Sequence, residues 1–173
     1  MKSALLCVLL SAFLAVPTHA QKTAWRQATA PELASVLPSR AQVVNEHIET
    51  EMRTASGIVN SRGQFLAAVV LLTAGYSADG KYSHYLLAQA PMHIATFTLP
   101  PGEYLIGWTR AGAEDMLNVH FNVAATGKLV GIAKAMRIPG RGPVVSIQIW
   151  PPQVGAKIQI GRFEIPYKLD RAR

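Results

Sequence analysis

Arg137 and Arg141 are the residues of this sequence whose type and spacing point most directly to binding chemistry. They flank a turn rich in proline and glycine, so both side chains should project from a rigid loop tip. A planar guanidinium group can donate two parallel hydrogen bonds to a carboxylate or a phosphate. If the last strands lie alongside this loop, three further cations extend the basic surface: Lys157, Arg162 and Lys168. We predict that these five residues bind a partner.

The positive charge of the chain is concentrated towards its C-terminus. The formal net charge is +7, and nine of the 17 Lys and Arg residues lie in residues 128–173, where only Glu164 and Asp170 are acidic. Such an asymmetry is typical of a surface that binds an acidic partner. A solvated basic face that binds nothing explains the same composition. We expect no nucleic acid among the partners.

Aromatic residues near arginine form a second possible binding feature. Trp108 stands two residues before Arg110 at the end of a predicted strand. An exposed tryptophan beside an arginine suits glycan stacking or a protein interface, whereas core packing is the commoner role of tryptophan.

One segment contains residue types that bind metals. If residues 46–53 form a strand, His47, Glu49 and Glu51 project from one face, and a divalent cation could use them. If the segment is a helix, His47 and Glu51 lie one turn apart. Neither spacing matches a metalloprotease helix, and a solvated charged face explains the same residues. We therefore predict neither a metal nor a cofactor.

No motif for catalysis is complete. Residues 75–81 fit the first seven positions of a phosphate-binding loop, but Tyr82 stands where a Mg²⁺-binding Ser or Thr should follow. A strand rather than a helix is predicted next, so we interpret the segment as a hairpin turn. His84, His93 and His120 lie in predicted strands, and their spacing selects none of them as a base. We assign no catalytic residue.

Most of the chain is patterned as β-strands. Residues 65–73 form a continuous β-branched and apolar run that predicts a strand buried on both faces, and residues 116–123 alternate with Leu117, Val119 and Phe121 on one face. The other predicted strands are 82–88, 93–99, 104–109, 129–138, 144–150, 157–160 and 162–165. Short strands separated by Gly and Pro turns predict a mainly β fold, an antiparallel β-sandwich or barrel.

The N-terminal part is less uniform. Thr29 and Glu32 match a capping box with Pro31 in the first turn, which predicts a short helix over residues 30–37. In residues 40–56 the apolar residues recur every four positions but also alternate, so the pattern favours a helix only slightly over a strand. We expect a leader and mixed segment over residues 21–62, followed by a β core over residues 63–173, within one domain.

One local motif resembles a known family. The turn Leu99-Pro100-Pro101-Gly102-Glu103-Tyr104, within residues 93–108, is similar to one hairpin of carboxypeptidase-regulatory or transthyretin-like sandwich domains. The resemblance implies a sandwich fold. Because such domains are usually accessory or binding modules, it also favours binding over catalysis.

The first twenty residues predict export. Lys2 precedes an apolar run over residues 4–16 that Pro17 ends, and Ala20 is a small residue suited to signal-peptidase cleavage. Cleavage there would start the mature chain at Gln21 and remove Cys7, the only cysteine. The run is too short to span a bilayer, so we expect no transmembrane segment and a periplasmic or secreted protein.

These observations lead to three functional hypotheses. The leading one is a non-enzymatic binding or accessory protein of a bacterial-type envelope, which engages an acidic protein, an anionic glycan or a lipid head group through its basic C-terminal face. The second is an envelope hydrolase with histidines and carboxylates in a groove. The third is an inhibitor or immunity-type protein that covers the active site of another protein.

Overall fold

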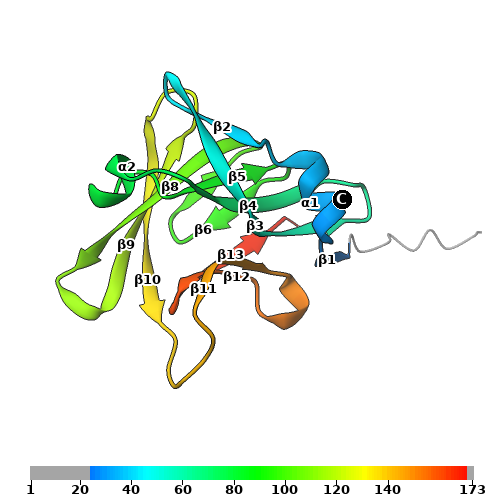
Figure 1. Cartoon of the computed structure of the whole chain (residues 1–173). Helices are drawn as coiled ribbons and strands as arrows, with labels where there is room; N and C mark the ends of the chain where they lie inside the picture. The colour runs from blue at the N-terminus through cyan, green and yellow to red at the C-terminus, as the bar shows by residue number, and fades with distance from the viewer. Residues whose placement is uncertain (1–23, 171–173) are drawn as a thin grey trace, which may run out of the picture.

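The computed structural model describes residues 24–170, apart from the side chains of residues 113 and 114, and Figure 1 draws these residues in colour. The predicted export signal over residues 1–20, with Cys7, and the predicted new terminus Gln21 lie outside the described residues. None of the helices among the described residues is long and apolar enough to cross a membrane.

The prediction of a mainly β, antiparallel fold is confirmed. The thirteen strands of the described chain, every pairing antiparallel, are β1 (Trp25–Gln27), β2 (Arg40–Val43), β3 (Glu46–Asn60), β4 (Phe65–Leu71), β5 (His84–Ala88), β6 (Met92–Ile94), β7 (Phe97–Leu99), β8 (Gly102–Ala111), β9 (Ala113–Val123), β10 (Leu129–Arg137), β11 (Val145–Trp150), β12 (Lys157–Gly161) and β13 (Phe163–Leu169). The helices are α1 (Ala30–Val36), the single turn α2 (Gly75–Ala78) and the 3₁₀ turn η1 (Pro152–Val154).

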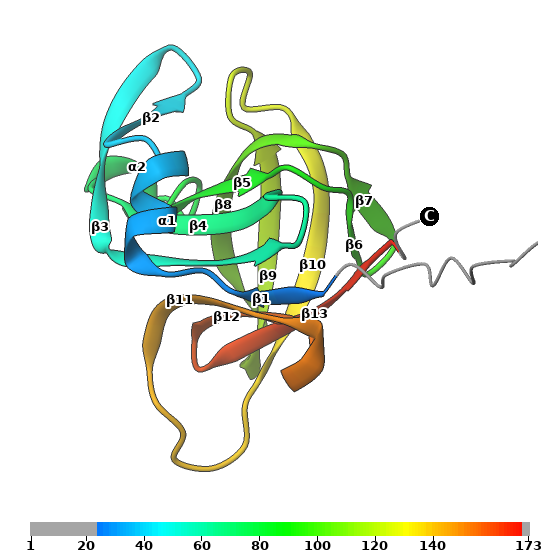
Figure 2. The ribbon, with the colours of Figure 1, turned by 90° about the vertical axis from the view of Figure 1, so that its right-hand side faces the viewer.

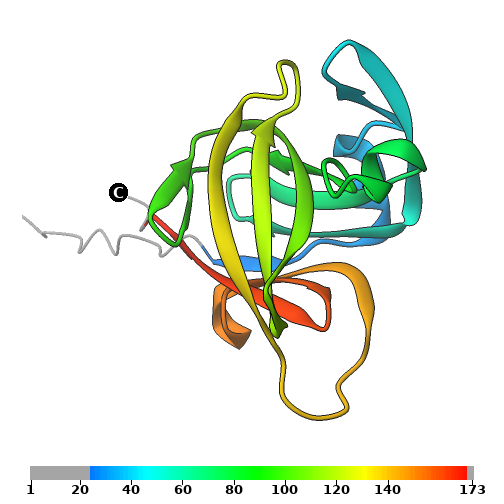
Figure 3. The same cartoon turned by 90° about the vertical axis from the view of Figure 1, so that its left-hand side faces the viewer.

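The main sheet curls into a nearly closed barrel. Its strand order is β1-β3-β4-β5-β8-β9-β10-β13-β12-β11, and the last strand, β11, returns to lie against β3 and β4. Figure 2 shows the long β10–β11 loop at the bottom and the β9–β10 turn at the top. We call the end of the barrel that carries the β10–β11 loop the loop end. At this end β8 also turns into β9 at Gly112, and β12 turns into β13 at Arg162. Figure 3 shows the same loop projecting from the other side.

Strand β4 separates two apolar cores. Its Leu66 and Ala68 face the barrel interior, whereas Ala67 and Val69 face outwards and are covered by α1 and β2. All four side chains are fully buried, which confirms the prediction of a strand buried on both faces. The predicted alternation in β9 is confirmed as well, because its apolar side chains face the barrel interior.

The short N-terminal helix is confirmed with its capping box. The backbone N–H of Thr29 donates to the Glu32 carboxylate at 2.8 Å, and Arg26 pairs with the same carboxylate at 2.6 Å. Hydrogen bonds from Arg26 and Thr29 lower the pKa of Glu32 to about 2. The apolar side of the helix places Leu33 over the outer face of the sheet.

The slight preference for a helix in residues 40–56 is wrong. These residues form the hairpin β2–β3, which turns at Val44 with a positive φ of 57°. The alternation of apolar residues outweighs their recurrence every four positions for two reasons. Ala41 and Val43 are fully buried in the outer core, and β3 pairs with β2, β4 and β1. Tertiary packing thus selects the extended conformation.

Two further segments differ from their predicted extents. Residues 93–99 form two strands, β6 and β7, which turn at Ala95 with a φ of 49°. Strand β7 pairs with β6, and β8 pairs with β5 and β9, so the strands on either side of the Pro100-Pro101 turn are not hydrogen-bonded to each other. The predicted hairpin turn over residues 75–81 contains the helical turn α2 and joins the antiparallel neighbours β4 and β5.

Side chains rather than a backbone ladder hold β11 against the opposite wall of the barrel. The Ser56 hydroxyl, on β3, accepts a 3.0 Å hydrogen bond from the backbone N–H of Ile149. His84, on β5, places Nε2 3.2 Å from the carbonyl oxygen of Ser146, and its Nδ1 lies 2.8 Å from the Ser83 hydroxyl. A neutral imidazole satisfies both contacts, with Nε2 donating and Nδ1 accepting. Burial lowers the pKa of His84 to about 4, so it is neutral at pH 7.

We predict that His84 makes the protein less stable in mild acid. The unfolded chain takes up a proton at this residue near pH 6.5, whereas the folded chain resists it until about pH 4. Stability is therefore lost as the pH falls through this window, by about 3 kcal/mol between pH 7 and 4. Urea unfolding across this pH range measures the loss, and His84→Gln should flatten it. An unchanged pH profile in that variant would contradict the assignment.

We also predict that Ser56→Ala destabilises the barrel. The substitution leaves the buried N–H of Ile149 without its acceptor, which costs about 1–3 kcal/mol in the free energy of unfolding. Denaturant titration measures the loss. Ser35→Ala is a matched control, because its hydroxyl bonds only within the exposed helix α1 and should change stability by less than about 0.5 kcal/mol.

Candidate ligand-binding site

The structure divides the five predicted partner-binding residues into two groups. Arg137 ends β10, Arg141 lies in the β10–β11 loop, and Arg162 lies in the β12–β13 turn, so the three arginines share the loop end. The backbone confirms this proximity, because the N–H of Ile138 donates to the carbonyl oxygen of Arg162 at 2.8 Å.

The two lysines lie elsewhere. Lys157, at the opposite end of β12, forms a 2.6 Å ion pair with Glu164. Lys168 lies in register with His93 of β6, five residues along β13 from the loop end. Five residues of a strand span about 17 Å. A single basic face containing all five residues is therefore not formed.

A cavity of about 310 Å³ lies at the loop end of the barrel. Six strands or their ends supply its lining: His84, Trp108, Arg110, Leu117, Val145, Ser146, Ile160, Gly161 and Phe163. Most of this lining is apolar. Small ligands are typically bound in cavities of this kind, including the mouths of β-barrels.

The cavity exists because the packed core stops short of the loop end. Along β8 the inward-facing residues are Tyr104, Ile106, Trp108 and Arg110. Tyr104 and Ile106 are buried in the core, whereas Trp108 is 38% exposed. The next inward position is charged, so apolar packing cannot continue. The sequence places Trp108 two residues before Arg110, but it does not place them at a cavity, because it does not show which strands lie opposite β8.

Arg110 is the charged group in the wall of this cavity. It lies directly opposite Leu117 in the β8–β9 register and is exposed. Among the described side chains, which do not include those of residues 113 and 114, no carboxylate or hydrogen-bond acceptor is paired with its guanidinium group. Arg141 and Arg162 likewise have no ion pair with a described residue. Arg137 pairs with Asp115 at 3.2 Å, and since both side chains are exposed this pair is worth little.

Two of these arginines, Arg137 and Arg162, lie next to residues that line the cavity. Arg162 follows Gly161, which lines the cavity, and Arg137 lies in register with Phe163, another lining residue. His84 contributes no charge, because it is neutral and both of its ring nitrogens are already engaged. The positive charge at the cavity therefore comes from arginine alone.

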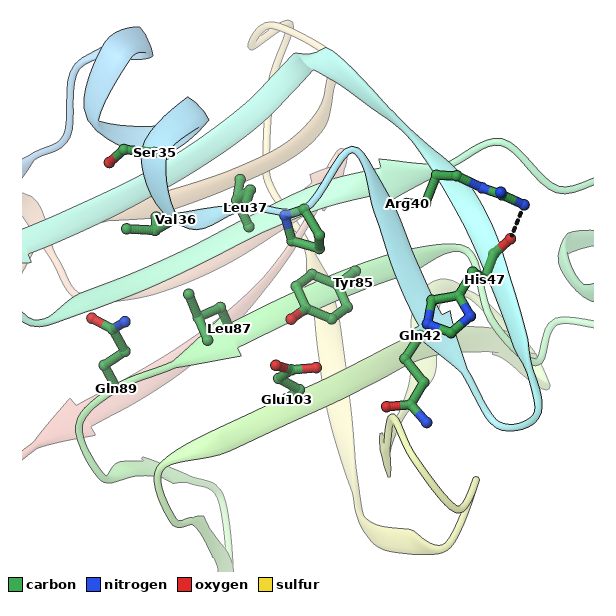
Figure 4. Close-up of a pocket in the computed structure, with 11 residues that line it drawn as sticks. Ser35, Val36, Leu37, Arg40, Gln42, His47, Tyr85, Leu87, Gln89 and Glu103 are labelled. Atoms are coloured by element: carbon green, nitrogen blue, oxygen red, sulfur yellow. Dashed lines mark hydrogen bonds between the residues drawn. The ribbon is translucent and has the colours of Figure 1, made fainter.

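A second hollow, a wide groove of about 640 Å³, lies on the outer side of the sheet under α1 and β2. Figure 4 shows Tyr85 and Leu87 on its floor, with the Glu103 carboxylate turned towards the Tyr85 hydroxyl. Burial, reinforced by the charge of Glu103, raises the pKa of Tyr85. Among the described residues that line the groove, Glu103 is the one carboxylate and His47 the one histidine. Glycoside hydrolysis by the usual mechanism requires two carboxylates, and this groove does not assemble them.

The candidate metal ligands on β3 do not converge. His47 lines the outer groove, whereas Glu51 forms a 2.7 Å ion pair with Arg53, whose hydrogen bonds lower the pKa of Glu51 to about 2. Glu49 is exposed. In the part of the chain that the structure describes, no three His, Cys, Asp or Glu side chains are arranged to hold a metal ion.

The side chains of Thr98, His93 and Asp170 are linked in the same order as a hydroxyl–histidine–aspartate catalytic triad. His93 Nδ1 lies 2.8 Å from the Thr98 hydroxyl, and His93 Nε2 lies 2.6 Å from the Asp170 carboxylate. The His93 and Asp170 side chains are 41% and 62% exposed, however. A nucleophile of this kind needs preorganised donors in a site that excludes water. The three groups are better explained as a contact that fixes β6 and β7 to the end of β13.

No protein-family model, no curated protein and no solved structure matches this chain, so its function has to be inferred from the geometry of the loop end.

Proposed function

We propose that the protein is a non-enzymatic binding protein that engages an anionic partner at the loop end of its barrel. The observation that carries this proposal is Arg110, which lines a cavity and whose guanidinium has no anionic partner among the described side chains. Arg137, Arg141 and Arg162 surround the same end. An anion placed there would receive charge-assisted hydrogen bonds from one or more planar guanidinium groups.

Charge and exposure favour this end over the rest of the surface. Three of the four arginines have no competing carboxylate within the described chain, and the fourth has only an exposed one. Since all four groups are in contact with water, they attract an anion from a distance and lose little solvation before contact. The lysines that the sequence placed in the same surface lack this arrangement, because Lys157 is already paired.

The predicted export signal supports an extracytoplasmic partner. If the first twenty residues are cleaved as predicted, the protein acts in the periplasm or outside the cell. Anionic molecules available there include acidic proteins, anionic glycans and the head groups of lipids. We propose that the partner comes from these classes.

The projecting β10–β11 loop supports a second candidate function. Residues 139–144 are all exposed, and the loop extends beyond the barrel in Figures 1 and 3. An inhibitor that inserts such a loop into another protein would form a stoichiometric complex. Deleting the loop tip would abolish that complex but would leave Arg110 in place.

We predict that reversing the charge at the loop end weakens anion binding. Arg137→Glu with Arg141→Glu should reduce affinity for an acidic probe, such as heparin or polyglutamate, by about tenfold or more at low salt. Binding of the unmodified protein should weaken steeply as salt is added. Fluorescence anisotropy of the labelled probe measures both effects.

The matched control moves the same charge change away from the loop end. Lys128→Glu with Lys168→Glu gives the same net charge, and both lysines are exposed. This variant should retain most of the affinity. Equal losses in the two double variants, or binding that is insensitive to salt, would contradict the proposal.

A further inference from the structure

We infer that the cavity at the loop end binds the apolar body of a small organic carboxylate, whose carboxylate group is held by Arg110. This inference goes beyond the proposed function, because its ligand is smaller than the acidic proteins, glycans and lipid head groups proposed above, and it rests on that function only for the recognition of an anion by arginine at the loop end. It adds the chemical class of the ligand, which the exposed arginines alone do not specify.

The walls of the cavity favour an apolar ligand. Leu117 and Ile160 lie at the boundary with the barrel core, where they are 4% and 5% exposed, and Phe163 and Trp108 add two aromatic rings. Trp108 keeps 38% of its surface in contact with water. A ligand that covered this indole ring would remove apolar surface from water, and burial of such surface stabilises a complex by about 25 cal/mol per Å².

The polar groups of the cavity select an anion rather than a cation. Arg110 is the charged residue among the described lining residues, and none of those residues carries a carboxylate. His84 cannot exchange its present bonds for a ligand without breaking the contact with Ser146 that helps to close the barrel. The lining thus combines an apolar interior with one guanidinium at the mouth, which matches a molecule with an apolar body and one terminal anion.

The volume limits the size of the ligand. A cavity of about 310 Å³ equals the volume of about ten water molecules in the liquid, so it accommodates on the order of ten non-hydrogen atoms. A carboxylate of that size with an aromatic ring also suits Trp108 and Phe163, because offset or edge-to-face ring contacts are favourable. The acyl chains of a membrane phospholipid and a glycan chain are both too large to be enclosed.

The test uses 3-phenylpropionate, its neutral amide and acetate as probes of the full mature chain in calorimetry. Phenylpropionate should bind with a stoichiometry of one and a dissociation constant below about 1 mM. The amide, which keeps the apolar body, and acetate, which keeps the anion, should each bind at least about tenfold more weakly. Arg110→Gln should remove the preference for the acid over the amide.

A pair of matched variants locates the binding site. Val145→Trp places a large side chain in the cavity lining and should reduce affinity for phenylpropionate at least about tenfold. Val154→Trp makes the same exchange at an exposed position on η1 and should leave binding unchanged. Thermal unfolding of each variant confirms that the fold is retained. If Val145→Trp does not fold, NMR of the unmodified protein locates the site instead. Adding phenylpropionate should then shift or broaden the indole resonance of Trp108.

The outcomes separate the inference from the proposed function. Absence of saturable phenylpropionate binding overturns the inference, while loss of heparin or polyglutamate binding in the Arg137/Arg141 double variant still supports the proposed function. Equal affinity for the acid and the amide overturns recognition of the anion by Arg110. Binding that survives Val145→Trp in a folded protein, with an unperturbed Trp108, also overturns the inference, because the ligand then lies elsewhere.

Discussion

The contact between β11 and the opposite wall of the barrel is the constraint on which the rest of the structure depends. A sheet of this curvature would expose its inner face if its ends stayed apart, and no backbone ladder joins them. Ser56 and His84 supply hydrogen bonds in place of that ladder. With the ends held together, Ile147 and Ile149 of β11 are buried against the inner side chains of β3, β4 and β5. A closure of this type ties core stability to the protonation of one imidazole.

The same closure fixes where the protein can be hollow. Inner side chains fill the barrel from β6 and β7 as far as Ile106, and the β6–β7 hairpin adds Met92, Ile94 and Leu99 to that core. His84 lies at the boundary, where it bonds to β11 and also lines the cavity. Since the interior on one side of this boundary is packed and the other side opens to water, the loop end is the part of the barrel that can admit a ligand without repacking the core.

The sequence was sufficient for the strands whose pattern is set by burial alone. Alternation predicted the inner face of β9, and continuous hydrophobicity predicted that β4 is buried on both faces, because each pattern reports the local environment directly. It was insufficient for residues 40–56, where two periodicities coexist and the neighbouring strand decides between them. It also could not reveal that the ring of Phe97 packs on Gly131, where a Cβ atom would lie only 2.5 Å from the ring.

The candidate site was likewise predictable from the sequence only in part. The sequence singled out Arg137, Arg141 and Arg162 by residue type, and the structure places all three at one end of the barrel. Lys157 and Lys168 were grouped with them because proximity along the chain was the available guide, whereas an antiparallel strand carries successive residues away from its starting end. The sequence indicated Arg110 only through its neighbour Trp108. Position 110 is known to face inwards only once the structure shows which alternate residues of β8 face the barrel interior.

Arg110 can carry a charge at an inward-facing position of β8 because that position lies at the mouth of the barrel. An arginine two inward positions deeper, at the level of Ile106, would lose its water and would need a buried counter-charge. At the mouth it remains hydrated, so the folded protein retains the charge at little cost, and the apolar residues behind it remain uncovered. A molecule that carries its own anion and its own apolar body can replace that water on both counts. The end of the packed core is therefore the structural feature on which the proposed binding site rests.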